Sequence, residues 1–373
     1  MYRGRHRTGS RERQQALRTS EFDYELPREL IAQTPIEPRD ASRLLVVDRA
    51  HRRLEHRQFS DLANLLCPGD LLVANESRVI PARLFARKVP TGGAVEMLLL
   101  KQHSPLMWEV LLKPGRRVKP GARLAIGSAP GSSEGTNRSQ LPVDGVFAEV
   151  ISKTEAGGRL LEFSVPIKPM LSELGIVPLP PYIRTPLQDP ERYQTIYSRT
   201  SGSVAAPTAG LHFTDRLLAG LGERGVHVAF VTLHVSMDTF RPVQEENIEQ
   251  HDMHSEYCQL PMETCVAINR ARLEGRRVIA VGTTSVRVLE TAGMRLHAGE
   301  ELLAFSGRTN LFVRPGHEFR VVQAMITNFH LPRSTLLMLV TAFTGKDLLD
   351  RSYEEAIRER YRFYSFGDAM LIV

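Results

Sequence analysis

The spacing of apolar residues after position 164 alternates between helical and strand periods. It predicts a helix over Thr214–Arg224 and then a strand over Val226–Val235. A second helix is predicted over Met262–Leu273, after which the strand Arg277–Val281 passes through a Gly-Thr-Thr-Ser turn into a third helix. Such alternation is typical of a layered α/β domain.

The stretch from Gly69 to Phe163 has a different pattern, in which short alternating runs are separated by glycine-rich turns. Several short strands at close spacing indicate a small β-barrel or sandwich. The runs are Leu71–Ala74, Val95–Leu100, Trp108–Leu112, Leu124–Ile126, Val146–Ile151 and Leu160–Phe163, with a Gly/Ser-rich loop over Ser128–Gln140. We therefore predict a layered α/β domain, residues 21–67 and 164–373, split in sequence by an inserted small β-barrel domain, residues 68–163.

The charge of the chain is concentrated at its N-terminus. Residues 1–20 hold six arginines and one glutamate, so they account for five of the six net positive charges. This tail has almost no apolar residues, and we expect it to be disordered. It is either an RNA-binding arm or a dispensable extension. The rest of the chain is nearly neutral, so any nucleic acid must bind through local basic patches.

Cysteine content and hydropathy point to one cellular compartment. The three cysteines, Cys67, Cys258 and Cys265, lie far apart, which argues against a disulfide framework and for a reducing environment. No apolar run approaches the roughly 20 residues that cross a bilayer. We expect a cytoplasmic protein that does not contact membranes.

Several polar, histidine-bearing turns follow the apolar strands. Ser203–Thr214 sets small residues, Pro207 and Gly210 ahead of a single imidazole, His212, just before a predicted helix. Comparable turns follow other strands at His234, at Gly282–Ser285 and at Asn328–His330. Each alone could be an ordinary turn or helix cap. Because ligands of α/β sheets settle beyond the carboxyl ends of strands, their co-occurrence indicates one shared pocket.

The segment His251–Tyr257 brings two imidazoles close to a carboxylate. Its spacing differs from the His-Glu-x-x-His zinc motif, and no third strong ligand motif accompanies it, so we expect no metal there. General acid–base work by His254 or Glu256 fits these residue types better. Near the C-terminus, Tyr361–Asp368 interleaves arginine with aromatic residues that could stack on bases or form a docked core element.

Taken together, these motifs resemble the S-adenosylmethionine:tRNA ribosyltransferase-isomerase family of queuosine biosynthesis. The resemblance runs from Phe22 to the C-terminus and leaves out only the tail and the Ser128–Gln140 loop. It is carried by Glu37–Arg43, Asn75–Val79, Val204–Thr214, His251–Tyr257, Val281–Arg287, Ile326–Pro332 and Gly367–Met370.

The resemblance implies a reaction and its participants. The ribosyl group of S-adenosylmethionine would be transferred to 7-aminomethyl-7-deazaguanine in a tRNA anticodon loop and isomerised. The products would be epoxyqueuosine-tRNA, adenine and methionine. S-adenosylmethionine would be a consumed substrate, and no cofactor or metal would be needed. We expect a monomer whose partners are this tRNA and S-adenosylmethionine.

The chemistry suggests roles for individual residues. The sulfonium acidifies the ribose C5′ hydrogens, so a base is needed there, and we assign it to His212 or His254, with Glu256 orienting an imidazole or the ribose. For S-adenosylmethionine binding we predict Pro207, Thr208, Gly210, His234, Gly282, Thr283, Thr284, Arg287, Asn328 and His330. For tRNA binding we predict Arg43, Arg78, Arg333, Arg362 and Tyr364.

The sequence also departs from the usual family pattern at a few positions. Ser236-Met237-Asp238 stands where Gly-Leu-Gly is usual, and Asn310 replaces a usual Asp. No whole motif is lost, so we expect an active enzyme. Two rivals remain: a non-catalytic tRNA-binding protein, which could dispense with the histidine-bearing turns, and a metal-dependent hydrolase, which would need zinc on His251, His254 and Glu256.

Overall fold

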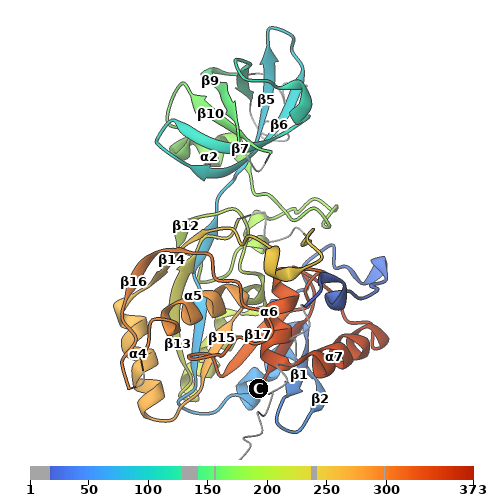
Figure 1. Cartoon of the computed structure of the whole chain (residues 1–373), viewed down its shortest axis with the longest axis vertical. Helices are drawn as coiled ribbons and strands as arrows, with labels where there is room; N and C mark the ends of the chain where they lie inside the picture. Colours follow the sequence, from blue (N-terminus) through green and yellow to red (C-terminus); the bar gives the residue numbers. More distant parts are fainter. Residues whose placement is uncertain (1–16, 128–141, 155–156, 237–241, 298) are drawn as a thin grey trace, which may run out of the picture.

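A computed structural model describes residues 17–373 except for 128–141, 155–156, 237–241 and 298. Figure 1 shows a large α/β body with a smaller β-barrel above it, joined by extended segments. The fold class predicted from sequence, an α/β domain with an inserted barrel, is confirmed. Within the described part, no helix is both long and apolar enough to cross a membrane.

The α/β body is built on a nine-stranded mixed sheet. From edge to edge its strands are β16 (Phe305–Thr309), β14 (Glu256–Leu260), β13 (His227–Leu233), β3 (Leu71–Asn75), β15 (Val278–Val281), β17 (Ala324–Asn328), β18 (Ala369–Ile372), β1 (Arg43–Asp48) and β2 (Arg53–Gln58). The four strands from β13 to β17 run parallel. Their carboxyl ends therefore meet at one edge, where α/β proteins place ligands.

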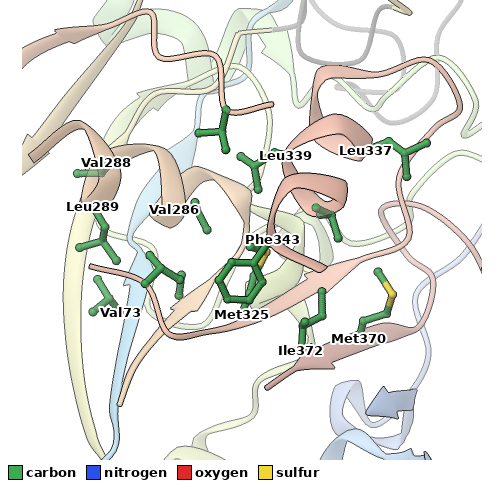
Figure 2. Close-up of a cluster of buried hydrophobic side chains, with 14 of the residues drawn as sticks. Val73, Val286, Val288, Leu289, Met325, Leu337, Leu339, Phe343, Met370 and Ile372 are labelled. Carbon is green, nitrogen blue, oxygen red and sulfur yellow. The ribbon is translucent and has the colours of Figure 1, made fainter. Parts of the chain in front are cut away.

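Alternate residues of the central strands face two separate cores, as strand geometry requires. One set, which includes Val73, Met325, Met370 and Ile372, packs against α4 (Met262–Leu273), α5 (Thr283–Gly293), α6 (Thr335–Thr344) and α7 (Lys346–Arg358). Figure 2 shows side chains of α5 and α6 meeting this face of the sheet. The other set packs against α1 (Leu62–Leu65) and α3 (Asp215–Glu223). The sheet is thus covered on both faces.

The helix boundaries follow local capping signals. Thr214 caps α3, because its hydroxyl accepts a hydrogen bond from the Leu217 N–H at 3.1 Å. Ser334 does the same for α6 through the Leu337 N–H, also at 3.1 Å. The predicted helix Met262–Leu273 has the same bounds in the structure, with Pro261 before it and Gly275 at positive φ after it.

The barrel closes six antiparallel strands on themselves. They are β5 (Arg83–Val89), β6 (Ala94–Gln102), β7 (Met107–Lys113), β10 (Arg159–Phe163), β9 (Pro142–Lys153) and β8 (Arg123–Gly127), which returns to β5. Helix α2 (Leu171–Leu174) packs on its core, and β11 (Gly175–Ile176) pairs with the start of β5. Strands β4 (Ser77–Val79) and β12 (Thr200–Ser203) pair in parallel on the connecting segments.

Two predicted boundaries are wrong. The barrel was placed at residues 68–163, but β3 lies in the centre of the large sheet, and residues 167–176 belong to the barrel through α2 and β11. The sequence pattern of a short apolar run is the same in a barrel strand and in a strand of the large sheet, so it does not distinguish the two. The disordered tail was drawn to residue 20, yet Thr19 is buried and its hydroxyl donates to the Glu245 carbonyl. Residues 1–16 and the predicted Ser128–Gln140 loop lie outside the described residues.

Candidate active site

A pocket, here called pocket A, opens at the carboxyl ends of the parallel strands. It encloses about 520 Å³ of empty space, part of it open to solvent. Its walls come from four segments distant in sequence and from Tyr182, Val235 and Leu336. The lining residues include Ala206, Pro207, Thr208, Gly282, Thr283, Thr284, Thr327, Asn328, His330, Tyr364 and Ser365.

The N-terminus of α5 forms one wall of pocket A. Gly282 has φ +86°, a conformation that side chains with a β-carbon rarely adopt, and it turns the chain from β15 into the helix. The first N–H groups of a helix lack partners within the helix and favour anionic groups. Among the described residues the buried hydroxyl of Thr284 also has no hydrogen-bond partner. Two kinds of donor are therefore available to a ligand here.

Asn328, at the end of β17, links two other segments that line pocket A through hydrogen bonds. Its Oδ1 accepts from the Thr208 hydroxyl at 3.0 Å, and its Nδ2 donates to the Tyr364 carbonyl at 3.1 Å. The same Nδ2 lies 3.3 Å from Nε2 of His212. Thr208 and Tyr364 thus keep fixed positions around the pocket.

His212 lies behind this wall and is absent from the lining of pocket A. Since the Asn328 amide donates to Nε2, the ring proton sits on Nδ1, which donates to the Ser42 hydroxyl at 2.8 Å. The ring stacks on Phe59. Burial, reinforced by Arg362 and Arg39, lowers the pKa of His212 to about 3, so the imidazole is neutral. Both ring nitrogens are already engaged, which suits a positioning role better than proton transfer.

His330 lines pocket A and is also held neutral. Its Nε2 lies 2.8 Å from the Thr327 hydroxyl, and burial lowers its pKa to about 3. Its backbone is fixed by two tyrosines, because the N–H donates to Tyr353 Oη and the carbonyl accepts from Tyr24 Oη. The wall is therefore polar yet uncharged.

A second cavity, pocket B, lies next to pocket A. Val235 and Leu336 line pocket A, and their chain neighbours Ser236 and Thr335 line pocket B. The other residues lining pocket B are Pro242, Gln244, Glu245, Gln250, His251, Asp252, Met253, His254 and Glu256. It is larger and richer in titratable groups than pocket A.

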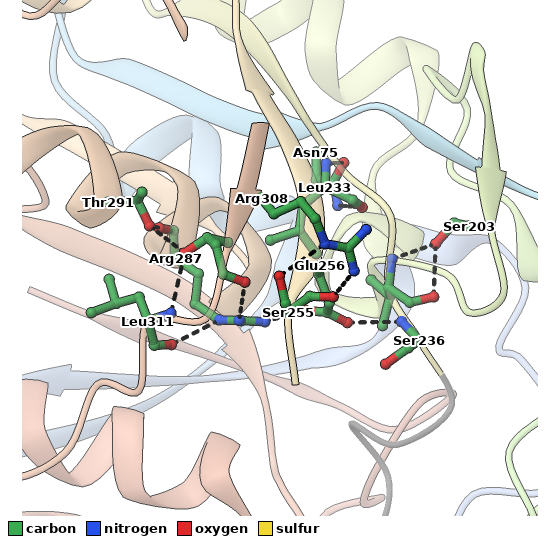
Figure 3. Close-up of polar contacts among 12 residues, drawn as sticks. Asn75, Ser203, Leu233, Ser236, Ser255, Glu256, Arg287, Thr291, Arg308 and Leu311 are labelled. Atoms are coloured by element: carbon green, nitrogen blue, oxygen red, sulfur yellow. Dashed lines mark hydrogen bonds and ion pairs between the residues drawn. The ribbon is translucent and has the colours of Figure 1, made fainter. Parts of the chain in front are cut away.

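Glu256 and Arg287 form a buried ion pair at the edge of pocket B. Figure 3 shows Arg287 of α5 reaching Glu256 at the start of β14, with Ser236 on the far side of the carboxylate. Both side chains are only 4% exposed. Glu256 Oε1 accepts from the Ser236 N–H at 2.8 Å, and Arg287 Nε donates to the Leu311 carbonyl at 3.1 Å. The pair thereby anchors Ser236, whose chain neighbour Val235 lines pocket A.

Three other predicted residues lie apart from pocket A. His254 is exposed and lines pocket B. His234 packs on Gly202 and stacks with Tyr257, and burial beside Lys168 lowers its pKa. Gly210 serves packing, because a β-carbon there would lie 2.1 Å from Tyr197 Oη. The Ser236–Asp238 departure lies partly outside the described residues.

The predicted tRNA-binding residues have different surroundings in the structure. Tyr364 lines pocket A and packs against Tyr182. Arg43 stacks on Tyr361, and Arg362 donates to the Thr34 carbonyl. Two more, Arg78 and Arg333, are exposed or half-buried and pair with Glu191 and Asp23.

Sequence reasoning missed Tyr182 and Ser365 in pocket A. Their hydroxyls are 2.7 Å apart, and burial raises the pKa of Tyr182 far above its usual value. Tyr182 lies in a proline-rich stretch without periodicity, so only the fold reveals it. Among the described residues, no group of three His, Cys, Asp or Glu side chains is placed to hold a metal ion.

Comparisons with known proteins find relatives along almost the whole chain. A family model described as "Queuosine biosynthesis protein" matches residues 19–372. An S-adenosylmethionine:tRNA ribosyltransferase-isomerase of Moorella thermoacetica is 52% identical over 363 residues, which cover 96% of this chain and all of that protein. One of Desulforamulus reducens is 49% identical over 359 residues, with the same coverage.

A solved structure extends the match to three dimensions. The crystal structure of an S-adenosylmethionine tRNA ribosyltransferase from Thermotoga maritima is 41% identical, with a TM-score of 0.53, and the match covers 95% of this chain and all of that one. The near-complete coverage of the chain and these sequence identities show that the chain belongs to the S-adenosylmethionine:tRNA ribosyltransferase-isomerase family.

Proposed function

We propose that pocket A binds S-adenosylmethionine and that the protein transfers its ribosyl group to 7-aminomethyl-7-deazaguanine in a tRNA anticodon loop. Isomerisation then gives epoxyqueuosine-tRNA, with release of adenine and methionine. The observation that carries the proposal is the convergence of the Pro207, Gly282 and Asn328 turns on one pocket at the strand ends. The names of the relatives support the same reaction.

The lining of pocket A suits the parts of S-adenosylmethionine. The α5 N-terminus and the Thr284 hydroxyl would bind its carboxylate. Tyr182 and Tyr364 would pack on the adenine ring. A polar wall without a cation, kept so by the neutral state of His330, would not repel the sulfonium.

The two candidate bases receive different tasks. Among the described residues, the ring nitrogens of His212 are occupied by Ser42 and Asn328, so we propose that His212 positions Asn328. His254 lines pocket B next to pocket A, and we propose it as the base for the ribose C5′ proton. Glu256 then acts indirectly, by holding Ser236 in place through the bond to its backbone N–H.

The remaining partners follow from the reaction. The tRNA would approach the mouth of pockets A and B, and Arg43, Arg78, Arg333 and Arg362 would contact its phosphates. S-adenosylmethionine is consumed as a substrate, and we propose no further cofactor. We also propose that the protein works as a monomer in the cytoplasm, where its tRNA substrate is found.

The test is to mix the protein, S-adenosylmethionine and tRNA bearing the aminomethyl base, and to measure adenine and methionine. Release that depends on the modified base is expected, and the matched control is the same tRNA carrying guanine. If neither product forms, the proposed function is wrong. If His212→Ala and His254→Ala both keep full adenine release, these residue assignments are wrong while the reaction stands.

A further inference from the structure

Pocket B contains a histidine–carboxylate pair that the reaction described so far does not use. Nδ1 of His251 lies 2.9 Å from Oε2 of Glu245, and the two side chains are 16% and 40% exposed. The hydrogen bond from His251 lowers the pKa of Glu245, so the carboxylate is ionised at neutral pH. A carboxylate in this position keeps the imidazole proton on Nδ1 and stabilises the imidazolium when it forms.

The imidazole of His251 is held in a fixed orientation. A one-turn 3-10 helix over Ile248–Gln250 precedes it, and the His251 N–H donates to the Ile248 carbonyl. Ile248 is fully buried, and the ring of His251 packs edge-on against Phe312 at 5.7 Å. A side chain that exchanges protons with a ligand must be held in a fixed orientation by its surroundings, as His251 is here.

His251 differs in this respect from the histidines of the pocket A wall. Both nitrogens of the His212 ring are engaged, and the His212 and His330 rings are held neutral by burial. In His251 the bonded nitrogen is Nδ1, and among the described residues nothing bonds to Nε2. That second nitrogen is the atom with which a ligand in pocket B could exchange a proton.

The contents of pocket B also fit the second substrate. The acceptor carries a primary amine, which is an ammonium ion at neutral pH and is not nucleophilic until it loses a proton. Glu245, Asp252 and Glu256 place carboxylates around the cavity, and Gln244 and Gln250 add amide groups that can bond to a base edge. Pocket B directly adjoins pocket A, so an acceptor there would lie beside the ribosyl donor.

We propose that pocket B receives the 7-aminomethyl base of the tRNA and that the His251–Glu245 pair deprotonates its ammonium group. The inference rests on the proposed function and adds a subsite and a catalytic residue to it. An N–H bond of the ammonium breaks, its electron pair stays on the amine nitrogen, and the proton forms a new bond to Nε2 of His251. Glu245 is the positioning residue, because it acts on the ammonium only through the imidazole that it holds.

The test compares single-turnover adenine release by the full-length protein and its variants on tRNA bearing the aminomethyl base. For His251→Asn we expect a loss of about 100-fold or more, the usual contribution of a general base. Its affinity for S-adenosylmethionine, measured by calorimetry, is expected to be unchanged. His251→Ala should recover activity when free imidazole is added, because the added base can enter the vacated space.

Glu245→Gln provides an independent variant. It should lower kcat about tenfold and leave the KM for tRNA unchanged, because it weakens the base and not the binding of RNA. The matched control is His51→Asn, which removes another histidine bonded to a carboxylate, that of Asp48, on an exposed turn outside both pockets. It should behave as the unchanged protein.

The outcomes separate this inference from the function on which it rests. If the unchanged protein releases no adenine, the proposed function fails. If it does, and His251→Asn keeps its rate within threefold, the inference fails and the function stands. It also fails if imidazole restores nothing to His251→Ala while Glu245→Gln keeps its full kcat.

Discussion

At the scale of single residues, burial decides which imidazoles can carry protons. His212 and His330 were predicted from sequence as site residues, and they do lie at or behind pocket A. Their neutral state could not be foreseen, because it depends on partners distant in the chain. Ser42 and Asn328 are 170 and 116 residues from His212. A motif shows that an imidazole is present, but only the fold shows which of its nitrogens are in use.

The buried histidines should make the protein sensitive to acid. Their folded pKa of about 3 lies below the unfolded value, so the unfolded chain takes up protons first and stability falls as pH drops below 6.5. Each should cost about 2 kcal/mol of unfolding free energy between pH 6.5 and 5. Urea denaturation at several pH values measures this. His330→Gln should show a shallower pH dependence than the unchanged protein, and an identical slope would contradict the prediction.

The Glu256–Arg287 pair makes a second prediction at this scale. Arg287→Met leaves a buried carboxylate without its cation and should cost about 3–5 kcal/mol of stability. Adding Glu256→Gln should recover part of that loss, because the charge disappears while the side-chain oxygen still accepts from the Ser236 N–H. A double-mutant cycle by denaturation checks it. Strictly additive effects would show that the two side chains are not coupled.

At the scale of elements, local signals were good predictors of helices and poor predictors of sheet membership. Capping residues and glycines gave α3 and α4 nearly to the residue. The run Leu71–Ala74 was assigned to the barrel, yet as part of β3 it pairs with β13 and β15 at the centre of the large sheet. The partners of a strand depend on residues distant in sequence, so a four-residue apolar run does not indicate which strands it will pair with.

The turn Thr208–His212 depends on close packing against Tyr197. Gly210→Ala would place a β-carbon 2.1 Å from Tyr197 Oη and should cost about 1–3 kcal/mol of stability. Tyr197→Phe alone should cost little, because that buried hydroxyl has no hydrogen-bond partner among the described residues. Combining the two should relieve part of the Gly210→Ala loss, though not all, since Thr195 Cγ2 is also only 2.8 Å away. Thermal unfolding of the three variants checks this, and no relief would rule out the clash as the cause.

At the scale of the whole molecule, the two bodies have separate cores. The barrel core draws on β5 to β11, while pocket A is built from segments of the α/β body alone. Sequence patterning predicted both bodies, because their turn chemistry and periodicity differ. It could not predict the order of strands in the large sheet, in which neighbours come from opposite ends of the chain.

This separation predicts that the α/β body binds S-adenosylmethionine without the barrel. Arg83 and Ile176 lie opposite each other in an antiparallel pair, so a short Gly/Ser linker can replace the segment between them. Calorimetry should give the deletion variant an affinity within threefold of the full chain. A scrambled linker of equal length is the control. A folded variant that no longer binds S-adenosylmethionine would show that the barrel contributes to pocket A.

The place of β18 has a consequence for synthesis on the ribosome. This strand, Ala369–Ile372, lies between β1 and β17 and pairs with both. Chain growth is vectorial, so β1 is made early but lacks its inner neighbour until Ala369–Ile372 has been synthesised. The barrel is contiguous in sequence and can complete much sooner. A nascent chain that stalls before β18 is made would therefore present a finished barrel and an open sheet edge, the state most exposed to misassociation.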